Sequence, residues 1–118
     1  MKTLLILNDP PYGTERSYNG LRMAHALAKN SPGAEITVFL MADAVLCAKH
    51  GQKTPEGHHN PEHMLKRVLS GAGNKVLLCG TCMDTRGMSD AEVLEGSRRS
   101  TMDELAQATL AADKVLVF

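Results

Sequence analysis

The sequence predicts an α/β fold, an open and mostly parallel sheet with helices on both faces. Two observations lead to this prediction. Short apolar stretches of strand length alternate along the chain with segments that have helical periodicity. The chain has 118 residues, which suits one sheet covered by a few helices. We therefore expect a single domain over residues 1–118, connected by right-handed crossovers.

The first part of the chain predicts two strands and one long helix. Residues 3–8 form a continuous apolar run, as expected of a strand that is covered on both faces. A helix follows over about residues 15–29 and ends before Pro32, because proline cannot continue the hydrogen-bond ladder. Residues 35–40 then predict a second strand.

The middle of the chain predicts two shorter helices that are joined by a polar loop. The first covers about residues 43–50, with Asp43 as its N-cap and Gly51 as its left-handed stop. The loop spans residues 51–59. Asn60 then caps a second helix, whose first residue is a proline.

The last part of the chain predicts a strand over residues 75–79, followed by a loop over residues 80–88. A short strand is expected near residues 92–95. A Thr-x-x-Glu capping box opens a helix over residues 101–112. The final strand covers residues 114–118.

Composition limits the possible partners. The 13 basic residues are balanced by 13 acidic residues, so no basic surface for direct nucleic-acid binding is expected. Two tyrosines and two phenylalanines offer little for stacking on bases. No apolar stretch approaches the roughly 20 residues that span a membrane, and no signal peptide is recognised. These features predict a cytoplasmic protein that buries part of its surface against copies of itself.

The three cysteines carry most of the chemical interest. Because their number is odd and the expected compartment is reducing, Cys47, Cys79 and Cys82 do not form a structural disulfide framework. Cys79 ends a predicted strand, where sites in open α/β sheets are found. Gly80 leaves its sulfur accessible, and Arg86 lies close enough in sequence to stabilise a thiolate.

The Cys-Gly-Thr-Cys segment fits several chemistries. A thiolate at Cys79 can accept sulfur from a persulfide donor, with Cys82 as an optional second thiol. Thiol–disulfide exchange has suitable spacing, but thioredoxin-like proteins place the motif at a helix start and use a later cis-proline, whereas Pro61 is the last proline here. Zinc needs further ligands. The alternative interpretation is that Cys79 is a small buried hydrophobic residue.

Other candidates have weaker patterns. His58, His59 and His63 are not spaced as one metal-binding turn, so we interpret them as a solvated loop and helix start and assign no metal ligands. The loop over residues 12–14 (Tyr-Gly-Thr) lies at the same sheet edge as Cys79 and is a candidate pocket wall. Arg98-Arg99 is a candidate anion contact, for which a solvated pair is the alternative.

Several segments together resemble the DsrE/DsrF-like family, and most closely its YchN-like branch. They are NDPPYGTERSYNGLRMAHAL, FLMADAV, GQKTPEG, CGTCMDTRGMS and STMDELAQATLAADKVLVF. The resemblance covers essentially the whole chain. Two departures are the His58-His59 pair, where similar sequences often carry aromatic residues, and Arg98-Arg99, where they are more apolar.

The resemblance implies a three-layer α/β/α sandwich with a five-stranded parallel sheet, and a homo-oligomer, typically a hexamer of two stacked trimers. It implies that Cys79 is the reactive cysteine and that Cys82 matches a second cysteine of this branch. Family members relay persulfide sulfur, in sulfur oxidation or tRNA thiolation.

We therefore expect an intracellular sulfur-relay protein, sulfurtransferase-like, with Cys79 and Cys82 as site residues and no cofactor. Gly80, Thr81 and Arg86 would shape the loop and stabilise the anion. The expected partners are further copies of the chain and protein donors and acceptors of sulfur. The alternatives are an oligomeric binding module for a small ligand or metal, or a C-x-x-C thiol–disulfide redox protein.

Overall fold

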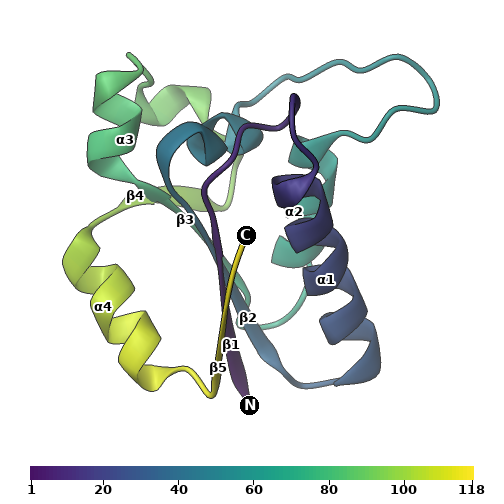
Figure 1. The fold of residues 1–118 in the computed structure, drawn as a ribbon, viewed down its shortest axis with the longest axis vertical. Coiled ribbons are helices and arrows are strands. Elements are labelled where there is room, and N and C mark those ends of the chain that lie inside the picture. Colours follow the sequence, from purple (N-terminus) through teal and green to yellow (C-terminus); the bar gives the residue numbers. More distant parts are fainter.

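Five parallel strands form one sheet in the computed structural model, which describes residues 1–118 (Figure 1). The strand order is β4-β3-β2-β1-β5. The strands are β1 (Lys2–Leu7), β2 (Glu35–Leu40), β3 (Lys75–Cys79), β4 (Ser97–Ser100) and β5 (Lys114–Val117). The helices are α1 (Arg16–Asn30), η1 (Ala42–Ala48), α2 (Pro61–Leu69), α3 (Gly80–Thr85), η2 (Asp90–Glu92) and α4 (Met102–Ala111), where η marks 3-10 helices. The predicted α/β sheet is confirmed.

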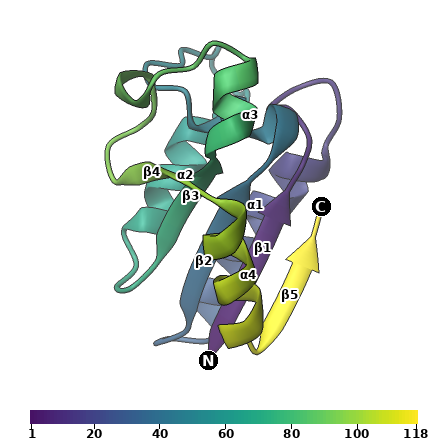
Figure 2. The same ribbon diagram turned by 90° about the vertical axis from the view of Figure 1, so that its left-hand side faces the viewer.

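The helices form a layer on each side of the sheet. Helices α1 and α2 lie together on one face, whereas α4 lies on the other face with α3 above it (Figures 1 and 2). The order of the strands explains why helices cover both faces. The chain advances from β1 to β4 in one direction and then returns across the sheet to place β5 beside β1. A right-handed crossover in the reversed direction puts α4 on the opposite face. The three-layer arrangement is confirmed.

The core is centred on the middle strands. Residues of β1, β2 and β3 contribute most of the fully buried leucines and valines, and Phe39 is the largest buried side chain. The two faces are covered unequally, because α4 buries only Leu105. Neither edge strand is apolar and buried along its length. No helix of the structure has the length and apolar character that crossing a membrane requires.

The prediction of a loop over residues 80–88 is wrong in its first half. Residues 80–85 form α3, and Cys79 is its N-cap. A Gly-Thr-Cys start has low helix propensity, so the sequence favours a loop there. The helix is stabilised locally, because the Cys79 sulfur accepts the main-chain N–H of Cys82 at 3.3 Å, in the way that a hydroxyl or carboxylate caps other helices.

The fourth strand also differs from its predicted position. It covers Ser97–Ser100 and not residues 92–95. The apolar pair Val93-Leu94 suggested a strand, but Leu94 is buried from an irregular segment and Val93 forms only an isolated bridge with Lys49. The real strand is polar because it lies at the sheet edge, where one side has no neighbouring strand.

Two predicted helix caps are corrected by the structure. The helix expected over residues 43–50 is the 3-10 helix η1, and its N-cap is Met41, without a side-chain hydrogen bond. At α4, the Thr101 hydroxyl does accept the N–H of Glu104 at 3.1 Å. The Glu104 carboxylate, however, does not complete the capping box. It accepts hydrogen bonds from Arg98 and Ser100 of β4 instead.

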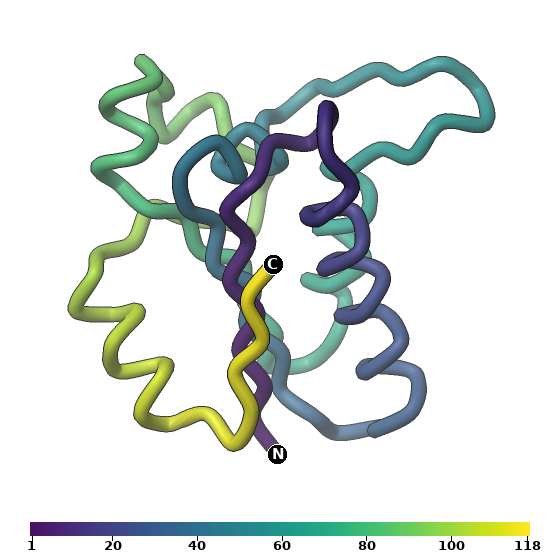
Figure 3. The backbone as a smooth tube through the Cα atoms, in the orientation of Figure 1, coloured from purple at the N-terminus to yellow at the C-terminus, as the bar shows by residue number.

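The long loop after η1 is fixed at its base. It projects beyond α1 and α2 in the backbone trace (Figure 3). The buried carboxylate of Glu62 accepts the main-chain N–H groups of Gly51 and Gln52 at 3.1 and 2.9 Å, and it also contacts His50. Asn60 caps α2 as predicted, accepting the N–H of His63. The loop is therefore held to α2 by side-chain to main-chain hydrogen bonds.

We predict that Glu104 gives the protein a specific sensitivity to acid. Hydrogen bonds from Arg98 and Ser100 lower the pKa of Glu104 to about 2, against partial burial that raises it. Because the folded-state pKa is below the unfolded one, this contribution to stability is present above the unfolded pKa and is lost as the pH falls toward about 2. Chemical denaturation followed between pH 5 and 2 should show a shallower loss of stability in Glu104→Gln than in the native protein. Equal slopes would contradict the prediction.

Candidate functional site

The Cys79 sulfur lies at the carboxyl end of β3, beside the end of β4. Cys79 is in register with Ser100 of β4, and 8% of its surface remains exposed. Its Sγ accepts the main-chain N–H of Cys82 at 3.3 Å and lies 3.5 Å from the Thr81 hydroxyl. The predicted placement of Cys79 is confirmed, and its sulfur is surrounded by hydrogen-bond donors.

These donors favour the anionic form of Cys79. Burial by itself raises the pKa of the thiol. Hydrogen bonds from the side chains and main-chain N–H groups of Cys82 and Thr81 act in the opposite direction and prevail, so that the pKa of Cys79 is below its ordinary value. A lowered pKa increases the thiolate fraction of Cys79, and the thiolate is the nucleophilic form of a cysteine.

Cys82 is placed differently, on the first turn of α3. Its sulfur accepts the main-chain N–H of Ala42 at 3.2 Å. Burial and its hydrogen bond to the Cys79 sulfur raise the pKa of Cys82, whereas the Ala42 N–H and the charge of Arg86 lower it. The net pKa is above the ordinary value. Cys82 is therefore the protonated partner, and its thiol donates toward Cys79.

The third cysteine does not take part in this arrangement. Cys47 is fully buried in η1, and its sulfur lies 3.9 Å from the Asp9 carbonyl oxygen. Burial raises the pKa of Cys47 to about 12, although a hydrogen bond to Ser17 lowers it slightly. A buried thiol with such a pKa is inert.

Arg86 contacts the neighbourhood of Cys82 and not the Cys79 sulfur. Its Nε donates to the Asp43 carboxylate at 2.9 Å, and its guanidinium also donates to the Cys82 carbonyl oxygen at 3.1 Å. Arg86 therefore does not have the predicted role of stabilising the Cys79 thiolate. It forms an ion pair with Asp43 that links the end of α3 to η1, and Asp43 does not cap a helix as predicted.

Tyr12 joins the loop of residues 51–59. Its hydroxyl donates to the His59 carbonyl oxygen at 2.7 Å, and its ring lies 5.0 Å from the His59 ring. On its other side, His59 stacks on Tyr18 with ring centroids 4.1 Å apart. This stack has no sequence signature, because His59 is more than 40 residues from both tyrosines along the chain. Tyr12 is therefore a packing partner of the histidine loop.

The three histidines of the cluster line one open hollow together with His25. His58 and His63 are exposed. No group of three or more histidine, cysteine or acidic side chains is arranged to hold a metal ion. His59 is held by ring stacking and by hydrogen bonds to the loop that carries Tyr12.

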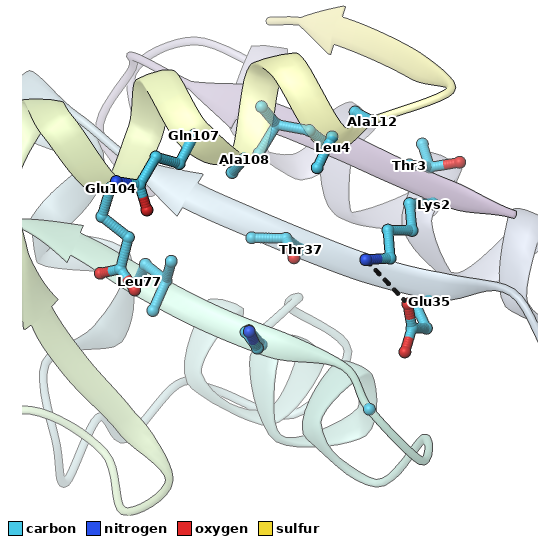
Figure 4. Close-up of a pocket in the computed structure, with 13 residues that line it drawn as sticks. Lys2, Thr3, Leu4, Glu35, Thr37, Leu77, Glu104, Gln107, Ala108 and Ala112 are labelled. Atoms are coloured by element: carbon cyan, nitrogen blue, oxygen red, sulfur yellow. Dashed lines mark ion pairs between the residues drawn. The ribbon is translucent and has the colours of Figure 1, made fainter.

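A cavity of about 270 Å³ lies far from the cysteines, at the amino ends of the strands (Figure 4). It is bounded by α4 and by the first residues of three strands, among them Lys2, Glu35 and Lys75. Lys2 faces Glu35 across it, with Nζ and Oε2 separated by 3.9 Å. Because the lining contains neither cysteine nor histidine, this cavity is not the thiol site.

Comparison with known proteins identifies the lineage of the chain. The model of the DsrE/DsrF-like family matches residues 1–118. The chain belongs to the DsrE/DsrF-like family. It is 43% identical over 117 residues to protein YchN of Escherichia coli, covering 99% of this chain and 98% of YchN. It is also 34% identical to a protein of Methanocaldococcus jannaschii over the whole length of both chains.

Solved structures agree with this assignment. The crystal structure of the Escherichia coli YchN protein matches with a TM-score of 0.92 at 42% identity, covering 99% of this chain and 98% of that one. A Methanobacterium thermoautotrophicum protein matches with a TM-score of 0.77 at 13% identity, over 99% and 97% of the two chains, and so shows the fold alone. The YchN-like branch of the DsrE/DsrF-like family is thus supported by sequence and structure.

Arg99 of this DsrE/DsrF-like chain, a candidate anion contact from the sequence, has a structural role that the sequence did not predict. It is not a solvated cation. Its guanidinium donates to the Gly80 carbonyl oxygen at 3.0 Å, to Asp84 at 2.9 Å and to Asp90 at 2.8 Å. Arg99 therefore ties the start of α3, the body of α3 and η2 to the edge strand β4. An exposed Arg-Arg pair without periodicity carries no sequence signal for such a role.

Gly80 lies close to Arg99 and Ser100 of β4, where a side chain would be crowded. A Cβ on Gly80 would lie 3.0 Å from Arg99 Cγ and 3.1 Å from the Ser100 carbonyl oxygen, and the latter is main chain and cannot move aside easily. The absence of a side chain lets the chain turn from β3 into α3 directly beside β4. This turn places the Cys82 N–H against the Cys79 sulfur.

We predict that Arg99 lowers the pKa of Cys79 indirectly, by positioning α3. In Arg99→Met, alkylation of Cys79 by iodoacetamide at pH 7 should be about three- to tenfold slower, because the hydrogen bonds to the sulfur loosen. Arg98→Met is the matched control, since Arg98 is the neighbouring residue but pairs with Glu104 and does not contact the Cys79 loop. Equal effects of the two variants on the pH profile of alkylation would show that Arg99 has only a structural role.

Proposed function

We propose that the protein is a sulfur-relay protein that carries persulfide sulfur on Cys79. The observation that carries the proposal is the environment of one sulfur atom. Cys79 is the one cysteine here with a lowered pKa, and it is partly exposed at the carboxyl edge of the sheet. The resemblance to the DsrE/DsrF-like family, in which persulfide relay is a known role, supports the same proposal.

The loading step is a simple exchange of sulfur. The Cys79 thiolate attacks the outer sulfur of a donor persulfide and forms a new S–S bond, while the donor S–S bond breaks. The donor leaves as a thiolate that keeps the bonding electron pair, and the transferred sulfur keeps its proton. No net oxidation occurs and no cofactor is needed. The same reaction in reverse, with an acceptor thiolate, unloads the protein.

The surroundings of Cys79 suit this chemistry. Hydrogen bonds from Thr81 and from the Cys82 main chain stabilise the thiolate before attack and again when the carrier is unloaded. The donor and acceptor would be proteins that present a persulfide or a thiol to the exposed edge. We place the protein in the cytoplasm, where thiols are kept reduced between cycles.

Thiol–disulfide exchange is the second candidate, and one observation favours it. The Cys-Gly-Thr-Cys segment begins a helix with Cys79 at the N-cap, which is the local geometry used by disulfide oxidoreductases. Thioredoxin-like proteins also carry the motif at a helix start, but after an early strand and with a later cis-proline. Here the motif follows the third strand, β3, and the last proline, Pro61, lies upstream of it.

Mass spectrometry of the intact protein after incubation with a persulfide donor tests the proposal. The native protein should gain the mass of one sulfur atom. Cys82→Ser should keep this gain and Cys79→Ser should lose it, because only Cys79 has a lowered pKa. Cys47→Ser is the matched control and should load normally.

The outcomes separate the two candidates. Loss of the mass of two hydrogens, without added sulfur, would indicate a Cys79–Cys82 disulfide and favour exchange. Loading that persists in Cys79→Ser would place the sulfur elsewhere. A protein with alkylatable Cys79 that gains no sulfur from any donor would overturn the relay proposal.

We propose further that copies of the chain cover the α4 and β5 surface. Large apolar side chains are exposed there, namely Met102, Leu110, Val115 and Val117. Leu110 is 87% exposed, and β5 is an edge strand. A soluble chain gains stability by burying such a surface against itself. The family resemblance implies a hexamer of two trimers.

Light scattering after gel filtration tests the assembly. Leu110→Lys should lower the molar mass of the native assembly, because it places a charge in the buried contact. Met23→Lys is the matched control, since Met23 is an exposed apolar residue on α1, on the opposite face of the sheet. A native protein that is monomeric at micromolar concentration would refute self-association.

A further inference from the structure

Ala42 has a backbone conformation that its residue type rarely adopts. Its φ is +50°, and it is the single residue other than glycine with a positive φ. A Cβ makes this left-handed region unfavourable, so such residues persist where the surroundings impose them, commonly at functional sites. Ala42 follows β2 at the start of η1, beside Cys82 of α3.

In this conformation the main-chain N–H of Ala42 points toward the sulfur of Cys82. The Ala42 N–H donates to Cys82 Sγ at 3.2 Å. The residues on either side are fixed, because the Met41 N–H donates to the Leu7 carbonyl oxygen at 2.9 Å and the Asp43 carboxylate accepts from Arg86. The corner after β2 is thus held to β1 on one side of Ala42 and to the end of α3 on the other.

We propose that the main-chain N–H of Ala42 positions and stabilises the Cys82 sulfur as an anion, so that Cys82 acts as a second sulfur carrier after Cys79. The proposal rests on the sulfur relay proposed above. It assigns to each of the two sulfurs its own main-chain donor, the Cys82 N–H for Cys79 and the Ala42 N–H for Cys82.

The transfer balances as a second exchange. The Cys82 thiol first loses its proton to solvent, and its thiolate attacks the outer sulfur of the Cys79 persulfide. A bond from Cys82 to that sulfur forms, the bond from Cys79 to it breaks, and the electron pair remains on Cys79 as a thiolate. The negative charge moves from Cys82 to Cys79. A donor at each sulfur stabilises the charge before and after the step.

The electrostatic surroundings of Cys82 are consistent with this role. The charged groups that act on it are Cys79, whose thiolate opposes ionisation, and Arg86, which favours it. The protonated Cys79 persulfide is the form whose outer sulfur a thiolate can attack, and in that form the opposing charge is absent, whereas the Ala42 N–H and Arg86 remain. Cys82 is then easier to ionise than it is beside the Cys79 thiolate.

Replacing the Ala42 N–H by an oxygen atom tests its hydrogen bond to the Cys82 sulfur. Cys47 is a natural ligation junction, so a synthetic segment of residues 1–46 with lactic acid in place of Ala42 can be joined to residues 47–118. The ester lacks only the N–H. In a Cys79→Ser background, the Cys82 pKa should rise by about one unit, seen as roughly tenfold slower alkylation at a fixed pH below the pKa.

The matched control is the same lactic acid at position 44. The Ala44 N–H donates to the Met41 carbonyl oxygen and not to sulfur, so this ester loosens the same turn without touching Cys82. It should leave the Cys82 pKa unchanged. Equal shifts for the two esters, or no shift for either, would overturn the proposal.

Two further measurements keep the result interpretable. In the recombinant Cys79→Ser protein, the Ala42 amide proton should shift with the ionisation of Cys82 and the Ala44 amide proton should not. If they behave alike, the proposal fails even where a ligated protein does not refold.

In ligated protein with Cys79 intact, peptide mapping after loading should find sulfur on Cys82 about tenfold more slowly with the ester at position 42. Absence of loading at Cys79 in every variant would refute the relay itself, while the pKa comparison would stand.

Discussion

The close approach of Gly80 to β4 is the contact on which the thiol site depends. β3 ends at Cys79 in register with Ser100, and the chain turns at once into α3. The turn runs so near the Ser100 carbonyl oxygen and the Arg99 side chain that a Cβ would make contacts of only 3.0 to 3.1 Å there. From this turn follows the placement of the Cys82 N–H on the Cys79 sulfur, and hence the lowered pKa of Cys79. Arg99 then holds the turn in place through Gly80, Asp84 and Asp90.

Three thiols in one small fold acquire three different reactivities from the balance of burial and hydrogen bonding. Burial raises the pKa of each of them. At Cys47 nothing comparable opposes it, and the thiol is inert. At Cys79 several donors outweigh it, and the thiol becomes the nucleophile. At Cys82 the neighbouring sulfur adds to the effect of burial, so that the pKa of the second thiol lies above its ordinary value.

Much of the fold was predictable, because parallel strands that are buried on both faces appear in the sequence as apolar runs. β1, β2 and β3 were located to within a residue or two, and Cys79 followed from the end of β3. The wrong predictions have two physical causes. β4 is a polar edge strand whose arginines pair with carboxylates of other elements, Glu104, Asp84 and Asp90, and α3 has a sulfur atom as its N-cap in place of the usual oxygen. Neither feature has a pattern in the sequence. The same reason hid Arg99, and it misplaced Arg86, whose partner Asp43 is 43 residues away along the chain.

The thiol site and the exposed apolar surface are joined by β4 and α4. Ser100 is in register with Cys79 and donates a hydrogen bond to Glu104, which in turn lies on the first turn of α4. The side of α4 that faces away from the sheet carries the exposed Met102 and Leu110. A subunit that packs against α4 would fix the position of Glu104, and through Ser100 the end of β4 against which Gly80 and Arg99 hold the cysteine loop. If copies of the chain pack against α4 as proposed, self-association and the reactivity of Cys79 are coupled, because β4 contacts both α4 and the cysteine loop.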